Sequence, residues 1–218
     1  MKVYESGTGD GLYIEAISLG MIGTNCYIVV SNATKTAVVT DPAEAEPVIR
    51  YIKAYGLSLK AIVLTHGHAD HISGVAELKA ACRCPVYLNE EDTDMAEDSS
   101  LNFAESLGLT GLTLVPDETF KDGDVLGFDD IELKVMHTPG HTKGSSCFMI
   151  EGHDVLLSGD TMFCGSYGRT DLYGGSDARM EESLLKLCSL DDAMLVLPGH
   201  GRTTTIGEEK YRYVRNIY

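Results

Sequence analysis

Six consecutive residues, His66-Gly67-His68-Ala69-Asp70-His71, contain four side chains that can bind a metal ion. They use three of the seven histidines of the chain and follow the apolar run 61–64. A strand would place His71 opposite the other three, and a helix would separate His68 from His66 and Asp70. Neither regular geometry gathers all four around one ion. A compact loop after a buried strand could divide them between two neighbouring ions, so the segment predicts a two-metal site.

Three further candidate ligands each follow a glycine after an apolar segment. They are His141, Asp160 and His200, which come after segments 131–136, 155–157 and 193–197. One such residue alone would be interpreted as part of a surface loop, but four ligand loops together indicate a metal site. Imidazole and carboxylate suit zinc, iron or manganese. Two such ions about 3.5–4 Å apart would lower the pKa of a shared water and give hydroxide near pH 7. No serine or cysteine nucleophile is then needed.

The elements that must position these residues are short strands and amphipathic helices. Apolar stretches predict strands at 13–19, 26–30, 36–39, 60–64, 86–88, 112–115, 131–136, 146–150, 155–157 and 193–197. Apolar residues at helical spacing predict helices at about 44–55, behind the histidine-rich loop at 72–78, around 177–188 with Ser176 or Asp177 as N-cap, and at 207–217. The strands come in two batches, each followed by helices. This order favours two packed sheets with helices outside, in a single domain 1–218.

Composition and charge narrow the class of protein. The chain is 44% hydrophobic and 23% charged, which is ordinary for a globular protein. No apolar run approaches the roughly 18 residues of a membrane helix, and residues 1–7 carry no apolar signal region, so we expect a cytoplasmic protein. A net charge of −16 without a lysine or arginine cluster argues against nucleic acid partners. The six cysteines have no C-x-x-C motif and are interpreted as free thiols. Nothing in the sequence indicates the oligomeric state.

The ordered ligand set resembles the five-part signature of the metallo-β-lactamase superfamily. The resemblance runs from Asn25-Cys26-Tyr27 and Asp41-Pro42 to the loop of His200. It implies an α/β fold whose helices and strands segregate into a four-layer αββα sandwich, with the site at one edge between the sheets. It also implies a first metal on His66, His68 and His141, a second on Asp70, His71 and His200, and Asp160 as the bridge.

Within that superfamily, two motifs are similar to glyoxalase II, the hydroxyacylglutathione hydrolases. They are His137-Thr138-Pro139-Gly140-His141-Thr142-x-Gly144-Ser145 and Gly159-Asp160-Thr161-x-Phe163. Gly168-Arg169-Thr170-Asp171 is typical of the shorter bacterial relatives, and also of persulfide dioxygenases. The resemblance implies hydrolysis of a small-molecule thioester such as S-lactoylglutathione. The cofactors would be two divalent ions, zinc or else iron or manganese, with Asp70 and Asp160 as catalytic carboxylates. Only 18 residues follow His200, so we expect no C-terminal helical domain of the kind that grips glutathione in longer members.

Two other activities use a similar ligand set. A persulfide dioxygenase with one iron on His66, His141 and Asp160 is the first alternative. Hydrolysis of β-lactams is disfavoured, because no secretion signal is present and the 168–171 motif is foreign to those enzymes.

Four further residues are candidates for contact with substrate or ligands. Asp41 is interpreted equally as a support for the ligand loop or as a cap of the following helix. Lys143, Tyr167 and Arg169 could contact substrate, although pairing of Arg169 with a nearby aspartate is slightly favoured. The acidic stretch 90–94 is interpreted as a solvent-exposed face.

Overall fold

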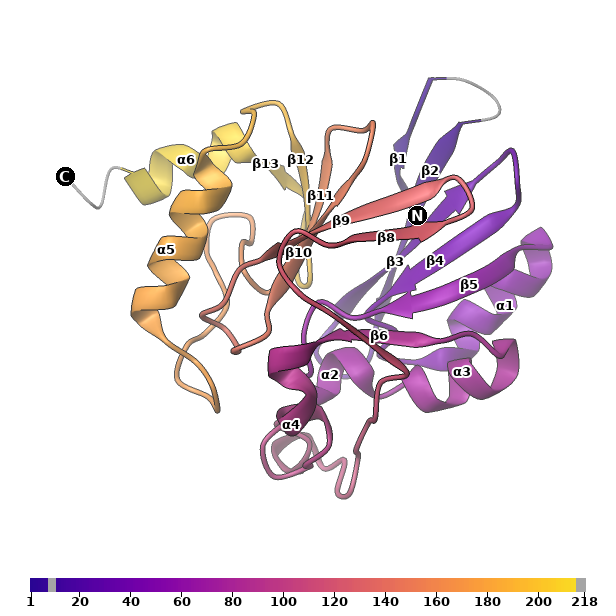
Figure 1. The fold of residues 1–218 in the computed structure, drawn as a ribbon, viewed down its shortest axis with the longest axis horizontal. Coiled ribbons are helices and arrows are strands. Elements are labelled where there is room, and N and C mark those ends of the chain that lie inside the picture. Colours follow the sequence, from indigo (N-terminus) through magenta and orange to yellow (C-terminus); the bar gives the residue numbers. More distant parts are fainter. Residues whose placement is uncertain (8–10, 215–218) are drawn as a thin grey trace.

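Two β-sheets packed face to face form the centre of the protein (Figure 1). The computed structural model describes residues 1–7 and 11–214. The first sheet contains, in spatial order, β1 (Lys2–Glu5), β2 (Leu12–Leu19), β3 (Thr24–Ser31), β4 (Thr36–Thr40), β5 (Ser58–Val63), β6 (Val86–Asn89) and β7 (Glu118–Phe120). The second contains β13 (Thr204–Thr205), β12 (Leu195–Pro198), β11 (Val155–Gly159), β10 (Ser146–Ile150), β9 (Ile131–His137) and β8 (Val125–Phe128).

Helices cover the outer face of each sheet. On the first sheet lie α1 (Ala45–Tyr55), α2 (Ala69–Ile72) and α3 (Val75–Cys82), and on the second lie α5 (Asp177–Cys188) and α6 (Ile206–Val214). Short helices η1 (Glu90–Asp92), α4 (Thr93–Ala96) and η2 (Glu105–Leu107) follow β6. Among the described residues, no helix is both long and apolar enough to cross a bilayer.

Three buried clusters account for the four layers. One joins the first sheet to its helices, for example Ile28 to Val48, and a second fills the space between the sheets, for example Val29 to Phe148. The third joins the second sheet to α5 and α6, for example Leu156 to Leu184. Neighbouring residues of β3 belong to different clusters because side chains of a strand alternate between its faces. The predicted αββα sandwich is therefore the observed architecture.

The strand ends bring the candidate ligands to one edge of the sandwich. β4 and β5 are parallel neighbours, so Asp41 and the loop starting at His66 leave the first sheet at the same edge. β11 and β12 are also parallel, which places Asp160 beside His200. β9 runs in the direction of β11, since each is antiparallel to β10, and so His141 joins them.

Most predicted elements are present within a few residues, and Ser176 is the N-cap of α5. The predicted strand at 112–115 is wrong. This segment is an extended loop in which the Leu114 N–H donates to Ala96 O (2.8 Å), and β7 takes the sheet position beside β6. The end of the predicted helix 207–217 lies outside the described residues, and the single-domain assignment stays a prediction.

The acidic segment after β6 also differs from expectation. It forms short helical pieces, but Asp92 is only 1% exposed, and Met95 and Ala96 are buried as well. The interpretation of 90–94 as a solvent-exposed face is therefore wrong for Asp92, whose carboxylate faces the ligand loops.

Candidate metal centre

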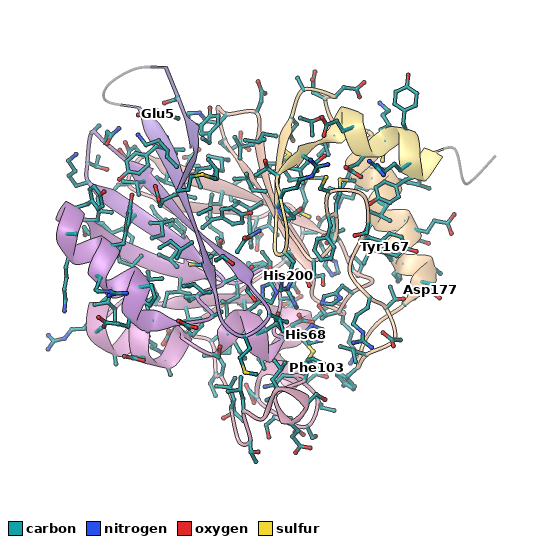
Figure 2. The ribbon with its side chains drawn as sticks, turned by 180° about the vertical axis from the view of Figure 1, so that it is seen from behind. Glu5, His68, Phe103, Tyr167, Asp177 and His200 are labelled. Atoms are coloured by element: carbon teal, nitrogen blue, oxygen red, sulfur yellow. The ribbon has the colours of Figure 1, made fainter. Side chains whose placement is uncertain are left out.

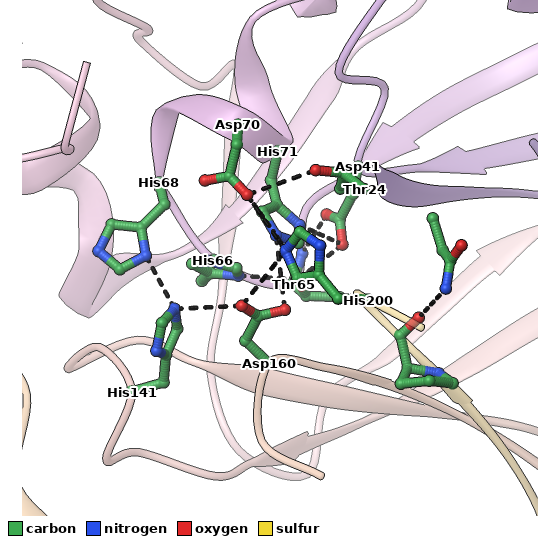
Figure 3. Close-up of polar contacts among 12 residues, drawn as sticks. Thr24, Asp41, Thr65, His66, His68, Asp70, His71, His141, Asp160 and His200 are labelled. Carbon is green, nitrogen blue, oxygen red and sulfur yellow. Dashed lines mark hydrogen bonds and ion pairs between the residues drawn. The ribbon is translucent and has the colours of Figure 1, made fainter. Parts of the chain in front are cut away.

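All seven predicted ligands converge at the edge between the two sheets (Figure 3). Their nitrogen and oxygen atoms form three groups, and within each group the atoms lie within 4.8 Å of one another. The groups are His66, His68 and His141; His66, His71 and Asp160; and Asp70, His71 and His200. The first and third groups match the two predicted halves, and the second contains the predicted bridge. We call the first group the imidazole half and the third group the mixed half.

Asp41 and Thr65 orient His66 through a chain of hydrogen bonds. Asp41 lies directly after β4, and its carboxylate accepts from the Thr65 N–H (2.9 Å) and from the Thr65 hydroxyl (2.7 Å). The Thr65 hydroxyl donates its only proton to Asp41, so it can only accept a hydrogen bond from His66 Nδ1, which lies 3.0 Å away. The lone pair of His66 is therefore on Nε2, which is buried and has no hydrogen-bond partner. The N-cap of α1 is Glu44 instead, so Asp41 supports the ligand loop and is not a helix cap.

An acceptor lies beside the outer nitrogen of two more imidazoles, through a hydrogen bond of His141 and an ion-pair contact of His71. His141 Nδ1 lies 2.7 Å from the carbonyl oxygen of Arg169, which can only accept, so the lone pair of His141 is on Nε2. His71 Nδ1 lies 3.1 Å from Asp41 Oδ2, which favours a proton on that nitrogen. Such partners on the outer nitrogen are typical of metal-binding histidines.

The imidazole half is buried, and burial keeps His66 and His68 neutral. Burial, together with the neighbouring imidazoles, lowers the pKa of His66 and of His68 well below the usual value of histidine. His68 Nδ1 faces His141 Nε2 at 2.8 Å. Neutral imidazoles whose nitrogens face one another in a buried space are the form that binds metal.

The mixed half concentrates negative charge around His71. Asp70 Oδ2 lies 3.2 Å from His71 Nε2 and 3.2 Å from His200 Nε2. Burial opposes a charge on His71, but the carboxylates of Asp70, Asp160 and Asp41 outweigh it and raise the pKa of His71 well above its usual value. Burial likewise opposes the charge of Asp70, and the His71 charge and hydrogen bonds from His200 and His71 lower the pKa of Asp70 below its usual range. This half therefore favours a cation.

Asp160 lies between the halves. Its Oδ2 is 3.5 Å from His141 Nε2 and 3.6 Å from His200 Nε2, and its Oδ1 is 3.5 Å from His71 Nε2. Buried Oδ1 has no hydrogen-bond partner. Gly199 permits this approach, because a Cβ atom there would lie 2.2 Å from Asp160 Oδ1. Two carboxylate oxygens directed at both halves suit a bridging ligand.

Asp92 joins the two loops that build the imidazole half, and the sequence did not single it out. Its carboxylate accepts from the Gly67 N–H (3.0 Å), the Thr142 hydroxyl (2.7 Å) and the Gly144 N–H (2.6 Å). Gly67 lies between two candidate ligands, and Thr142 follows His141. Burial raises the pKa of Asp92, although these hydrogen bonds partly offset the effect. The usable signal is the spacing of Asp92, Met95 and Ala96, which is that of one helical face.

Five of the seven candidate ligands line a pocket of about 240 Å³, namely His68, Asp70, His141, Asp160 and His200. Its rim includes Arg169, whose guanidinium lies 5.8 Å from the centre of the Phe103 ring and forms two hydrogen bonds with Asp171. Figure 2 shows Phe103 beside His68 at this mouth, and Tyr167 farther away, towards α5.

The other two candidates for substrate contact do not line this pocket. Tyr167 lines a groove on α5, and the Lys143 ammonium pairs with Asp94 (3.2 Å) and Tyr173 (3.0 Å) above a different groove. Of the substrate candidates, only Arg169 therefore lies where the ligands converge, while Asp41 lies behind them.

Three comparisons place this geometry among known proteins. The family model for the metallo-beta-lactamase superfamily matches residues 19–200. The hydroxyacylglutathione hydrolase GloC of Haemophilus influenzae is 32% identical and aligns with 90% of this chain and 94% of its own length. The crystal structure of the BLEG-1 B3 metallo-beta-lactamase is 36% identical, with a TM-score of 0.85 and coverage of 90% and 95%. That of TTHA1623 in a di-iron-bound form is 34% identical, with a TM-score of 0.80 and coverage of 89% and 96%.

Proposed function

Because this chain belongs to the metallo-β-lactamase superfamily, we propose that it is a metal-dependent hydrolase that cleaves small-molecule thioesters. The observation that carries the proposal is the convergence of seven nitrogen and oxygen ligands, three in each half and Asp160 between the halves. The orientation of His66 and His141, with Nε2 lone pairs directed into the site, supports metal binding there. The di-iron form of TTHA1623 supports two ions of zinc, iron or manganese.

The thioester part of the proposal draws on one relative. A protein named hydroxyacylglutathione hydrolase has nearly the same length as this chain, since 94% of it is aligned. The motifs around His141 and Asp160 are similar to those of the same group. Both observations favour thioesters among the substrates of this superfamily.

The residues of the site suit hydrolysis of a thioester. Bound divalent ions would supply Lewis-acid activation of water and of the substrate carbonyl oxygen. Asp70 lines the pocket that holds most of the candidate ligands, so its carboxylate can accept a hydrogen bond from an attacking water and orient it. The oxygen of water bonds to the carbonyl carbon, the carbon–sulfur bond breaks, and the products are a carboxylate, a thiol and a proton. A thiol has a pKa of about 8.5, so its thiolate leaves without a strong general acid.

The direct test is release of free thiol by the purified full chain. Protein loaded with zinc, iron or manganese is given S-lactoylglutathione and several simpler thioesters, and thiol is measured with a chromogenic disulfide. We expect turnover that disappears after chelation and returns with metal. The matched control is His66→Ala, which should bind less metal and stay inactive. No thiol from any thioester would refute the proposal. One iron per chain with oxygen consumption on a persulfide would favour the dioxygenase alternative.

The BLEG-1 comparison favours β-lactam hydrolysis as a second candidate, because that protein carries the name of a B3 metallo-β-lactamase at 36% identity. The same metal-loaded preparation should therefore be tested with a chromogenic cephalosporin. Opening of the β-lactam ring with kcat/KM above that of every thioester would make it the leading function.

A further inference from the structure

A second, largely apolar pocket adjoins the pocket of the candidate ligands. Its volume is about 200 Å³, and it shares Ile22 and Asp70 with the ligand pocket. Its apolar lining comes from Met21, Ile22, Ala43, Leu107 and Leu109. A group seated there would lie beside Asp70, on the side of the mixed half.

One wall of this pocket consists of large apolar side chains that are exposed to solvent. Met21 and Ile22 lie in the turn between β2 and β3 and are 82% and 51% exposed. Leu107 and Leu109, at and just after η2, form the facing wall. Large apolar side chains gathered at the rim of a polar site, and left uncovered, indicate a surface that is buried when a ligand binds.

The charges around the two pockets disfavour an anionic ligand group here. Among the described residues that line them, Arg169 is the one lysine or arginine, and its guanidinium is already paired with Asp171. The second pocket instead carries the carboxylates of Glu44 and Asp70. Glutathione conjugates carry two carboxylates, which would find no free cation on this side. An uncharged aliphatic group would bury the apolar lining without a charge conflict.

We propose that the second pocket binds an uncharged aliphatic group of the substrate, so that the carbonyl next to it lies beside Asp70 and faces the other candidate ligands. The inference builds on the proposed thioester hydrolysis and defines its substrate class. The aliphatic group is attached either through the acyl carbon or through sulfur, since the pocket would recognise the same chemistry in both. Bound there, it excludes water from the side of the pocket next to the reacting carbonyl.

The first experiment measures kcat/KM of the zinc-loaded full chain on two series of uncharged thioesters. One series lengthens the acyl chain from acetyl to octanoyl on N-acetylcysteamine, and the other lengthens an S-alkyl chain on an acetyl group. We expect about a fourfold gain per buried methylene in one series, from ~0.8 kcal/mol each, until the pocket is full. The series that shows the gain identifies the attached side.

A leucine double variant and a methionine variant assign the effect to this pocket. The double variant Leu107→Ala/Leu109→Ala should reduce the ratio of kcat/KM for the longest and shortest substrates by about tenfold. Met21→Ala should reduce the same ratio by a smaller factor, and because Met21 is 82% exposed this variant keeps the fold. The matched control is Leu185→Ala, an exposed leucine of α5 that lines a different groove. It should leave the ratio unchanged.

A binding measurement separates failure of the pocket from failure of the proposed function. S-octyl-N-acetylcysteamine is a thioether that cannot be hydrolysed, and its Kd is measured by calorimetry on the parent, Met21→Ala and Leu185→Ala. Weaker binding to Met21→Ala alone supports the pocket, even if no thioester is cleaved and the proposed function fails. Thioester cleavage with no dependence on chain length, or equal binding to all three proteins, would overturn the inference and leave the hydrolase intact.

Discussion

The two halves of the candidate metal centre are built from the same loop but have opposite electrostatic character. The imidazole half consists of three buried histidines, and burial lowers the pKa of His66 and His68. In the mixed half three carboxylates surround His71 and raise its pKa. The imidazole half therefore offers the lone pairs of uncharged imidazoles. The mixed half attracts positive charge even without a bound metal ion.

The supports of the two halves differ as well. Asp92 holds the backbone of the loops that carry the imidazole half, through Gly67 and Gly144. Asp41 contacts His71 of the mixed half and reaches His66 through Thr65. The imidazole half thus depends on two buried carboxylates and the mixed half on one. The predictions below separate these dependences.

The largest effect should come from Asp160, the residue that lies between the halves. Asp160→Ala removes the two oxygens that face His141, His71 and His200. We expect the metal content to fall below two ions per chain and kcat/KM to fall at least ~1,000-fold, which is about 4 kcal/mol. Mass spectrometry of the metal content and thioester turnover measure both. Glu132→Ala, an exposed carboxylate of β9, is the control. Full metal content in Asp160→Ala would contradict the bridging role.

Removal of one terminal ligand from each half should split the centre. His141→Ala should empty the imidazole half and keep one ion in the mixed half, and His200→Ala should do the reverse. Each should lower kcat/KM ~100-fold or more, because the remaining ion cannot hold water and carbonyl together. Equilibrium dialysis against a chelator, followed by metal analysis, gives the stoichiometry. Loss of both ions in each variant would show that the halves do not bind independently.

Substitution of the supports should weaken the halves unequally. Asp92→Asn leaves at least one of three donors without an acceptor, so we expect ~10–100-fold weaker binding in the imidazole half alone. Asp41→Asn should weaken both halves by a similar factor. Asparagine tolerates the left-handed backbone of Asp41 (φ 49°), so this change removes charge without strain.

The two halves are measured separately in the His141→Ala and His200→Ala backgrounds. Asp94→Asn, two residues from Asp92 but exposed, is the matched control and should keep the affinity of both halves. If Asp92→Asn lowered the metal affinity of both halves equally, Asp92 would not be a specific support of the loops that carry the imidazole half.

The sequence predicted the ligands better than their supports, for a physical reason. His141, Asp160 and His200 each follow an apolar strand and a glycine, so a local pattern marks them. Parallel strands then bring distant loops to one edge, which makes the shared site predictable from local signals.

Asp92 has no such local mark. It lies in the acidic run 90–92, and its donors are more than twenty residues away in either direction. The helical spacing of Asp92, Met95 and Ala96 indicates one buried face, but which loops that face packs against depends on the tertiary fold. The same holds for segment 112–115, whose apolar residues pack as a loop because the edge beside β6 is filled by β7.

The smallest effect on metal affinity is expected at Arg169, and it tests whether the backbone orients the imidazole half. The carbonyl oxygen of Arg169, not its side chain, accepts from His141 Nδ1 (2.7 Å). Arg169→Ala keeps that acceptor and removes only an exposed guanidinium paired with Asp171. Metal affinity of both halves should therefore change less than twofold, and KM for a carboxylate-bearing thioester should change as little, because the guanidinium is already paired with Asp171. Suppose that Arg169→Ala weakened metal binding in the imidazole half as much as Asp92→Asn does. The Arg169 side chain would then also support this half. The imidazole half would depend on more supporting groups, relative to the mixed half, than Asp92 and Asp41 alone provide.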